Sequence, residues 1–132
     1  MDERGYRRLE VWKLARELTI EIHEMTLTSL PKFEMFEMGS QIRRSMKSVR
    51  SNVVEGFGKR IWKPEFVRHL TYAIGSCDET IDHLETLWET RSLADQDLFT
   101  SLSEKLDLLK RKLVRFRQCV QRDHQPLDQQ GT

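Results

Sequence analysis

Apolar residues recur every three or four positions along almost the whole chain, and this spacing restricts it to amphipathic α-helices. Four such stripes follow one another, and no segment shows the alternation of a β-strand or an internal repeat. Long helices with short connections favour an all-α, antiparallel up-down-up-down four-helix bundle. The stripes are Leu9, Trp12, Ala15, Leu18, Ile22 and Met25; Met35, Met38, Ile42, Met46, Val49 and Val53; Phe66, Leu70, Ala73, Cys77, Ile81, Leu84 and Trp88; and Leu98, Leu102, Leu106, Leu109, Leu113, Phe116 and Val120.

The helix ends are marked by residues with known terminal preferences. The first helix should run from about Leu9 to Thr28 and end before Leu30-Pro31, because the residue before proline avoids helical geometry. Gly56-Phe57-Gly58 predicts the turn that ends the second helix. Pro64 suits an early position of the third helix, and Asp95 can cap the fourth.

Length and composition indicate a single helix-rich domain. The chain has 132 residues, of which 38% are hydrophobic and 33% charged, with only 6 Gly and 3 Pro. We expect an N-terminal extension over residues 1–8, the bundle domain over 9–123 and a frayed tail over 124–132. No apolar run is long enough to span a membrane, and the polar start does not resemble a secretory signal, so we expect a cytoplasmic protein. Cys77 and Cys119 lie on apolar stripes and are expected to be reduced core residues.

The second helix carries an unusual concentration of positive charge. No acidic residue lies between Glu37 and Glu55, and the following segment also carries several cations. In one interpretation these cations contact nucleic-acid phosphates while Trp62 and Phe57 stack on bases. In the other they pair with acids of a neighbouring helix or subunit, and the two aromatic side chains close the end of the bundle. The cations are Arg43, Arg44, Lys47, Arg50, Lys59, Arg60 and Lys63.

The motifs of the common enzyme and metal sites are missing. A di-metal bundle needs Glu-x-x-His elements, whereas Glu65 and His69, like Glu79 and His83, are four positions apart and predict surface hydrogen-bonded pairs. There is no phosphate-binding glycine loop, nucleophile elbow or Cys-x-x-Cys pair. We therefore expect no enzymatic activity, no metal and no cofactor.

Two further features concern helix packing. Ser45 and Asn52 lie beside the apolar seam of the second helix, where they can permit close approach and fix the register. Several apolar residues lie outside the main stripes and either widen the buried face or form a homo-oligomeric interface, of which we favour the interface. They are Val11, Leu14, Ile74, Leu87 and Leu108.

Several short motifs, in this order and spacing, resemble those of the bacterial 23S rRNA-intervening-sequence protein family. They are Leu9-x-Val11-Trp12-x-x-Ala15, Leu30-Pro31, Gln41-Ile42-Arg43-Arg44-Ser45, Ser51-Asn52-Val53-Val54-Glu55-Gly56 and Gly75-Ser76-x-x-Glu79. The resemblance implies a small cytoplasmic bundle that assembles as a homopentamer, without known catalysis and with a nucleic-acid connection. Members are also similar to the accessory proteins of diversity-generating retroelements, which bind nucleic acid and a reverse transcriptase.

These observations lead to two functional hypotheses. In the first, a non-enzymatic homo-oligomer binds RNA or DNA through the seven cations of the second helix and the segment that follows it. In the second, the bundle is a protein-binding scaffold or accessory subunit for a nucleic-acid enzyme such as a reverse transcriptase, and it makes no direct nucleic-acid contact.

Overall fold

The computed structural model describes residues 5–123, which form four α-helices and two short 3-10 helices. In chain order the elements are η1 (Gly5–Arg8), α1 (Glu10–Thr28), η2 (Lys32–Phe36), α2 (Met38–Gly58), α3 (Lys63–Glu89) and α4 (Gln96–Asp123). The described residues contain no strand, so the predicted all-α fold with four helices is confirmed. The predicted tail, residues 124–132, lies outside the described part of the chain.

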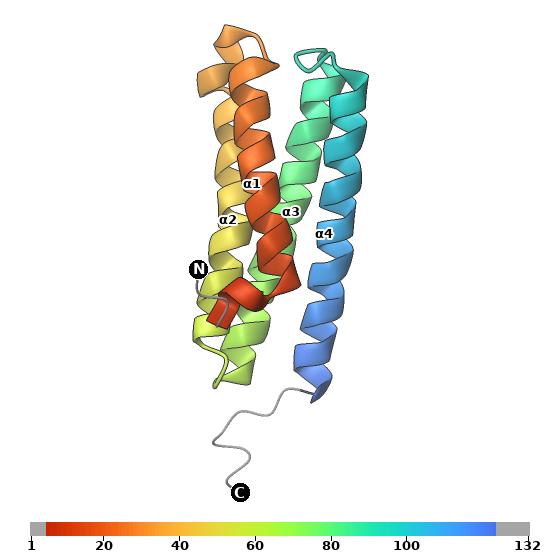
Figure 1. Cartoon of the computed structure of the whole chain (residues 1–132). Coiled ribbons are helices and arrows are strands. Elements are labelled where there is room, and N and C mark those ends of the chain that lie inside the picture. The colour runs from red at the N-terminus through yellow and green to blue at the C-terminus, as the bar shows by residue number, and fades with distance from the viewer. Residues whose placement is uncertain (1–4, 124–132) are drawn as a thin grey trace, which may run out of the picture.

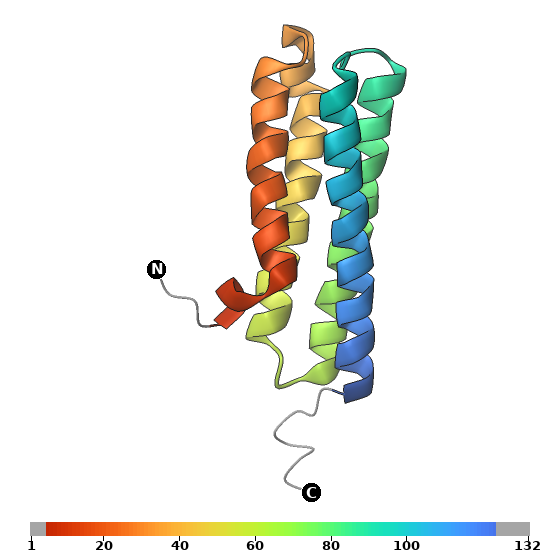
Figure 2. The same ribbon diagram turned by 45° about the vertical axis from the view of Figure 1, so that its right-hand side comes forward.

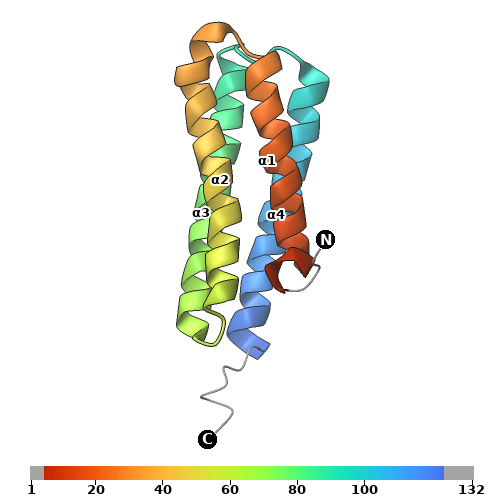
Figure 3. The ribbon, with the colours of Figure 1, turned by 60° about the vertical axis from the view of Figure 1, so that its left-hand side comes forward.

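The four helices lie side by side as one bundle whose two ends differ (Figure 1). The α2–α3 turn and the last turns of α4 lie at one end, with η1 toward the same end, whereas η2 and the α3–α4 connection lie at the other (Figures 1 and 2). The α2–α3 pair is packed most extensively, and α1 and α4 share the least contact among the neighbouring helices (Figure 3). Of the helices within residues 5–123, none has an apolar stretch that could cross a membrane.

The predicted stripes form one continuous core. Leu18, Ile42, Leu70 and Leu106, one from each helix, are fully buried, and each such side chain stabilises the fold by about 1.5–3 kcal/mol. The third stripe is displaced near its end, because Ile81 and Trp88 are half-buried whereas Leu87 is completely buried.

The apolar residues outside the main stripes mostly belong to the same core. Val11, Ile74 and Leu87 are buried within the chain, so for these three the interpretation as an oligomer interface is wrong, and they widen the buried face instead. Leu14 is half-buried and Leu108 is 37% exposed. Large exposed apolar side chains lie elsewhere, notably Phe33, Phe36, Ile61, Trp62 and Tyr72.

The helix ends partly follow the sequence signals. The Oδ1 atom of Asp95 accepts a hydrogen bond from the backbone N–H of Leu98 at 3.1 Å, which confirms the predicted cap, and Pro64 lies in the first turn of α3. The predicted turn at Gly56-Phe57-Gly58 is wrong, because α2 continues to Gly58 and the chain turns over residues 59–62. Gly56 instead permits close helix packing, since a Cβ atom there would lie 3.0 Å from the Cβ of His69.

The joint between η2 and α2 is held by a buried carboxylate. Glu34 accepts hydrogen bonds from the hydroxyl of Ser92 at 2.6 Å and from the backbone N–H of Met38 at 3.3 Å, so it ties the start of α2 to the α3–α4 connection. A Cβ atom at position 39 would lie 2.5 Å from the backbone oxygen of Glu34, which requires Gly39. Helix α2 therefore begins at Met38, and Met35, at the start of the predicted stripe, belongs to η2.

Candidate nucleic-acid interface

Arg43 is committed to holding the fold together. Its Nη1 atom donates to the Oγ1 of Thr26 on α1 at 2.9 Å, and its Nη2 atom donates to the backbone oxygen of Met35 in η2 at 2.8 Å. The side chain is half-buried where α1, η2 and α2 meet. Of the seven predicted site residues, it is therefore the one whose side chain is most clearly a structural link.

Arg50 and Arg60 lie against aromatic rings that belong to the core. The guanidinium carbon of Arg50 lies 5.3 Å from the ring centre of Trp12, and that of Arg7 lies at the same distance. Arg60 lies 4.0 Å above the ring of Phe57 and donates to the backbone oxygen of that residue at 2.9 Å. Cation–π contacts of this kind orient a guanidinium without neutralising it.

The two aromatic residues predicted to stack on bases differ in their exposure. Phe57 is only 7% exposed and packs edge to face against Phe66, so the proposal that Phe57 stacks on bases is wrong. It closes the end of the bundle, as the alternative interpretation had it. Trp62 lies in the turn before α3 and is 55% exposed, so its ring is accessible to a ligand.

Arg44, Lys47 and Lys63 are the least constrained of the predicted residues. Arg44 and Lys47 are exposed on α2 and Lys63 is half-buried at the start of α3. Arg44 also lines a polar groove of about 460 Å³ between α2 and α3, together with Ser48, Ser76 and other polar side chains. In these positions the three cations are accessible to another molecule.

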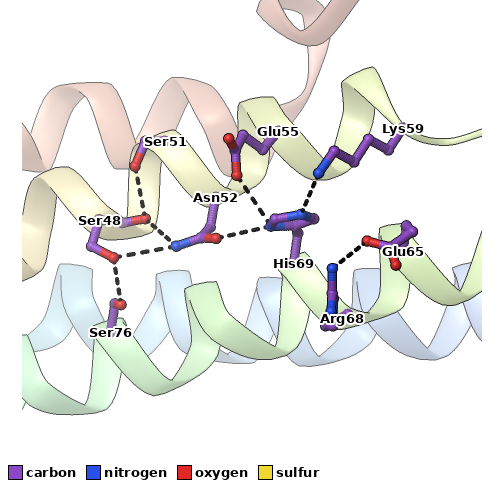
Figure 4. A network of polar contacts seen from close by, with 9 residues as sticks. All are labelled: Ser48, Ser51, Asn52, Glu55, Lys59, Glu65, Arg68, His69 and Ser76. Carbon is purple, nitrogen blue, oxygen red and sulfur yellow. Dashed lines mark hydrogen bonds and ion pairs between the residues drawn. The ribbon is translucent and has the colours of Figure 1, made fainter.

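Lys59 is held by a buried histidine that sequence reasoning placed on the surface. The Nζ atom of Lys59 lies 3.3 Å from the Nε2 of His69, and the Nδ1 of His69 lies 3.1 Å from the Oδ1 of Asn52 (Figure 4). Because an ammonium group can only donate, Nε2 accepts and Nδ1 carries the proton that is donated to Asn52. The carboxylate of Glu55 lies 3.4 Å from the same Nδ1.

The polar contacts continue along the α2–α3 seam. The amide nitrogen of Asn52 donates to the backbone oxygen of Ser48 at 3.0 Å and to its hydroxyl at 3.2 Å, and this hydroxyl lies 2.8 Å from that of Ser76 (Figure 4). Farther along, the hydroxyls of Ser45 and Thr80 lie 2.8 Å apart. The seam is thus fixed by paired polar groups, which supports the structural interpretation of Ser45 and Asn52.

The predicted pairing of Glu65 with His69 is wrong. Glu65 pairs with Arg68 at 2.6 Å, while His69 points into the α2–α3 seam, where it is 6% exposed (Figure 4). His83 and Glu79 both line the polar groove between α2 and α3. In the part of the chain that the structure describes, no three His, Cys, Asp or Glu side chains gather as metal ligands would.

The lysines of α4 have carboxylate partners, whereas most of the predicted cations have none in the described part of the chain. Lys105 pairs with Glu21 at 2.8 Å and with Glu17, and Lys110 pairs with Asp78 at 2.7 Å; these hydrogen bonds raise the pKa of both lysines. Among residues 5–123, no carboxylate pairs with any of six predicted cations, which excludes the neighbouring-helix part of the alternative interpretation there. The six are Arg43, Arg44, Lys47, Arg50, Lys59 and Lys63.

Sequence reasoning missed the positive charge near the end of α4. Between Lys105 and Arg117 that helix holds six cations against Asp107, a signal as strong as that of the second helix. The lysines there are paired, but Arg111 and Arg115 are exposed and have no ionic partner within residues 5–123. They lie on the helix whose end shares one end of the bundle with the α2–α3 turn (Figure 1).

The two cysteines are both free thiols. Cys77 is completely buried, as expected, and burial together with the nearby Asp78 raises the pKa of its thiol to about 12. Cys119 is only half-buried, so the expectation of a core residue holds for Cys77 alone.

The family described as 23S rRNA-intervening sequence protein matches residues 7–115, which is most of the chain. The chain belongs to this family. A crystal structure of a protein of unknown function from the S23 ribosomal protein family of Bacteroides thetaiotaomicron has the same fold, with a TM-score of 0.74. It is 21% identical, and the match covers 82% of this chain and 95% of that one. No curated protein gives a significant sequence match. Family membership thus agrees with the resemblance of the motifs and with the four-helix fold.

Proposed function

We propose that this member of the family is a non-enzymatic, cytoplasmic nucleic-acid-binding protein, a homopentamer of antiparallel four-helix bundles. Its phosphate contacts come from α2 and the α2–α3 turn, and Arg43 supports that surface from within. RNA is the first ligand to test, because the family takes its name from an intervening sequence of ribosomal RNA. The contacting residues in this proposal are Arg44, Lys47, Arg50, Lys59, Arg60 and Lys63.

The observation that carries the proposal is that, among residues 5–123, no carboxylate pairs with five of these cations, namely Arg44, Lys47, Arg50, Lys59 and Lys63. Uncompensated like charges on one helix repel one another, and a helix selected only for solubility usually mixes acids among its cations. The lysines of α4 differ from the cations of α2 because each is paired with an acid of α1 or α3. A phosphate backbone relieves this repulsion and releases its own counterions in the process. The exposed ring of Trp62 adds a stacking surface beside the turn.

The test is binding of labelled single-stranded and duplex RNA and DNA, followed by fluorescence anisotropy across a salt series. Each lost phosphate contact should lower the slope of log K against log salt by about 0.7 for a single strand and 0.9 for a duplex. The double variant Arg44→Ala, Lys47→Ala should therefore lower the slope by about 1.4 for a single strand and about 1.8 for a duplex.

The matched control is the double variant Lys105→Ala, Lys110→Ala, which also removes two positive charges. Its lysines are already neutralised by Glu21 and Asp78, so its slope should stay within experimental error of the unaltered protein. An equal decrease of the slope in both double variants would show that only the net charge of the protein matters, and not contacts made by α2. An unaltered slope in the Arg44, Lys47 variant would remove α2 from the interface.

A second candidate, the accessory subunit of a nucleic-acid enzyme, is favoured by exposed aromatic residues at the other end of the bundle. Phe33 and Phe36 of η2 are 66% and 88% exposed, which is typical of residues that a protein partner covers. This candidate predicts no RNA or DNA binding even at low salt in the same experiment.

A further inference from the structure

A pocket of about 490 Å³ lies between the start of α1 and the last turns of α4, away from the α2–α3 seam. Its walls are apolar and include Leu9, Val11, Phe116 and Cys119. Of the neighbouring helix pairs, α1 and α4 make the least contact, which explains why the core is open at this place. Its volume is within the range of small-molecule sites.

Three of the residues that line the pocket are positively charged. Arg8, Lys112 and Arg115 line it, and the one acidic lining residue, Glu10, is already paired with Lys112 at 3.2 Å. Arg8 lies over the ring of Phe57 and Arg115 is exposed without an ionic partner in residues 5–123, so two cations remain for a ligand. An apolar interior below two uncompensated guanidinium groups suits a molecule with an apolar body and an anionic head.

The lining also distinguishes between kinds of amphipathic anion. Among residues 5–123, the lining includes no neutral hydrogen-bonding side chain such as Ser, Asn or Gln. A nucleobase whose edge lay against the apolar wall would leave those donors and acceptors unpaired, at a cost of about 1–3 kcal/mol for each buried group. A saturated alkyl chain has no donors or acceptors, so it leaves no hydrogen bond unmade when it enters the pocket.

We propose that this pocket binds a free single-chain amphipathic anion, with the alkyl chain against Leu9, Val11 and Phe116 and the carboxylate or phosphate head at Arg8 and Arg115. The pocket shares no lining residue with the proposed nucleic-acid contacts, and this proposal does not depend on them. Positive charge and an apolar wall in the same pocket are the two properties that select this ligand class.

Cys119 provides a reporter within the pocket wall. It is half-buried and lines the pocket, so a neutral maleimide should alkylate it, and a bound alkyl chain should block the reaction. Cys77 serves as an internal control for unfolding, because it is completely buried and its thiol pKa is raised to about 12. Mass spectrometry distinguishes the two sites of alkylation.

The experiment measures the alkylation rate of Cys119 by N-ethylmaleimide in the full chain, with dodecanoate added below its micelle concentration. We expect protection of at least about tenfold at saturation and none from dodecyltrimethylammonium, which has the same tail and the opposite charge. Arg115→Glu should raise the dodecanoate concentration needed for half-protection by about tenfold. Arg111→Glu, one turn away on the same helix and outside the pocket, should behave as the unaltered protein.

Four outcomes would overturn the proposal. They are equal protection by the cationic amphiphile, no protection by dodecanoate, an unchanged half-protection concentration in Arg115→Glu, and a Cys119 that is unreactive before any probe is added. The last would mean that the pocket is already covered. Alkylation of Cys77 on addition of dodecanoate would show that the probe unfolds the bundle, and the protection experiment is then repeated with dodecyl phosphate, to which the same four outcomes apply.

Discussion

Replacing Arg43 and replacing Arg44 should have opposite consequences, although the two residues are adjacent and carry the same charge. Arg43→Ala removes two charge-assisted hydrogen bonds, at 2.9 Å to Thr26 and 2.8 Å to the backbone oxygen of Met35. Bonds to charged groups contribute about 1.5–3 kcal/mol each, and these two share one half-buried guanidinium, so we expect a loss of about 3 kcal/mol. Arg44→Ala removes an exposed cation and should change stability by less than about 0.5 kcal/mol.

Urea denaturation followed by helical circular dichroism checks this difference at one fixed protein concentration. With a slope of about 2 kcal/mol per molar urea, the loss in Arg43→Ala corresponds to a midpoint lower by about 1.5 M with the slope unchanged. Under conditions in which Arg43→Ala remains folded, it should retain the salt dependence of RNA binding that Arg44→Ala reduces. Equal stability of the two variants would refute the structural assignment of Arg43, and so would a reduced salt slope in a fully stable Arg43→Ala.

Two further predictions concern stability. Gly39→Ala should lose at least about 2 kcal/mol, because its Cβ would lie 2.5 Å from the backbone oxygen of Glu34, whereas Gly75→Ala, with no atom within 4 Å, should gain about 0.5–1 kcal/mol; thermal unfolding of both variants checks this contrast. Burial raises the pKa of the Cys77 thiol from 9.0 to about 12, so between these values the folded chain holds a proton that the unfolded chain has lost. Stability should therefore fall with rising pH by about 1.4 kcal/mol per unit more steeply in the unaltered protein than in Cys77→Ala, and parallel urea curves from pH 8 to 10.5 would contradict this assignment.

The bundle could be predicted from the sequence because the apolar period indicates where helices form and, apart from the end of α3 and a few flanking positions, which face is buried. Asp95 and Pro64 acted as the terminal signals they usually are. The turn prediction at Gly56 was wrong because glycine occurs both in turns and where two helices pack closely. Which of the two applies depends on the residue that packs against the glycine. That residue is His69 of α3, whose position depends on how the helices pack.

The candidate site could be predicted in composition but not in geometry. Charge density on α2 is visible in the sequence, yet the role of each cation depends on residues far away in the chain. Arg43 reaches Thr26 and Arg50 reaches Trp12, and neither partner is indicated by local spacing. The cations of α4 could have been found from the same kind of pattern, but their pairing with acids of α1 and α3 could not.

The polar seam between α2 and α3 connects the fold to the proposed function. Apolar stripes alone tolerate a shift of one helix along another, because similar side chains meet again after each turn, whereas paired hydroxyls and a His–Asn contact match in one register only. At this seam the register also sets where the cations lie, since Arg44 borders the groove beside Ser48 and Ser76, and Lys59 is bound by His69 itself. The small polar residues of the seam bury little apolar surface. Their paired contacts instead fix the location of the surface that is proposed to bind phosphates.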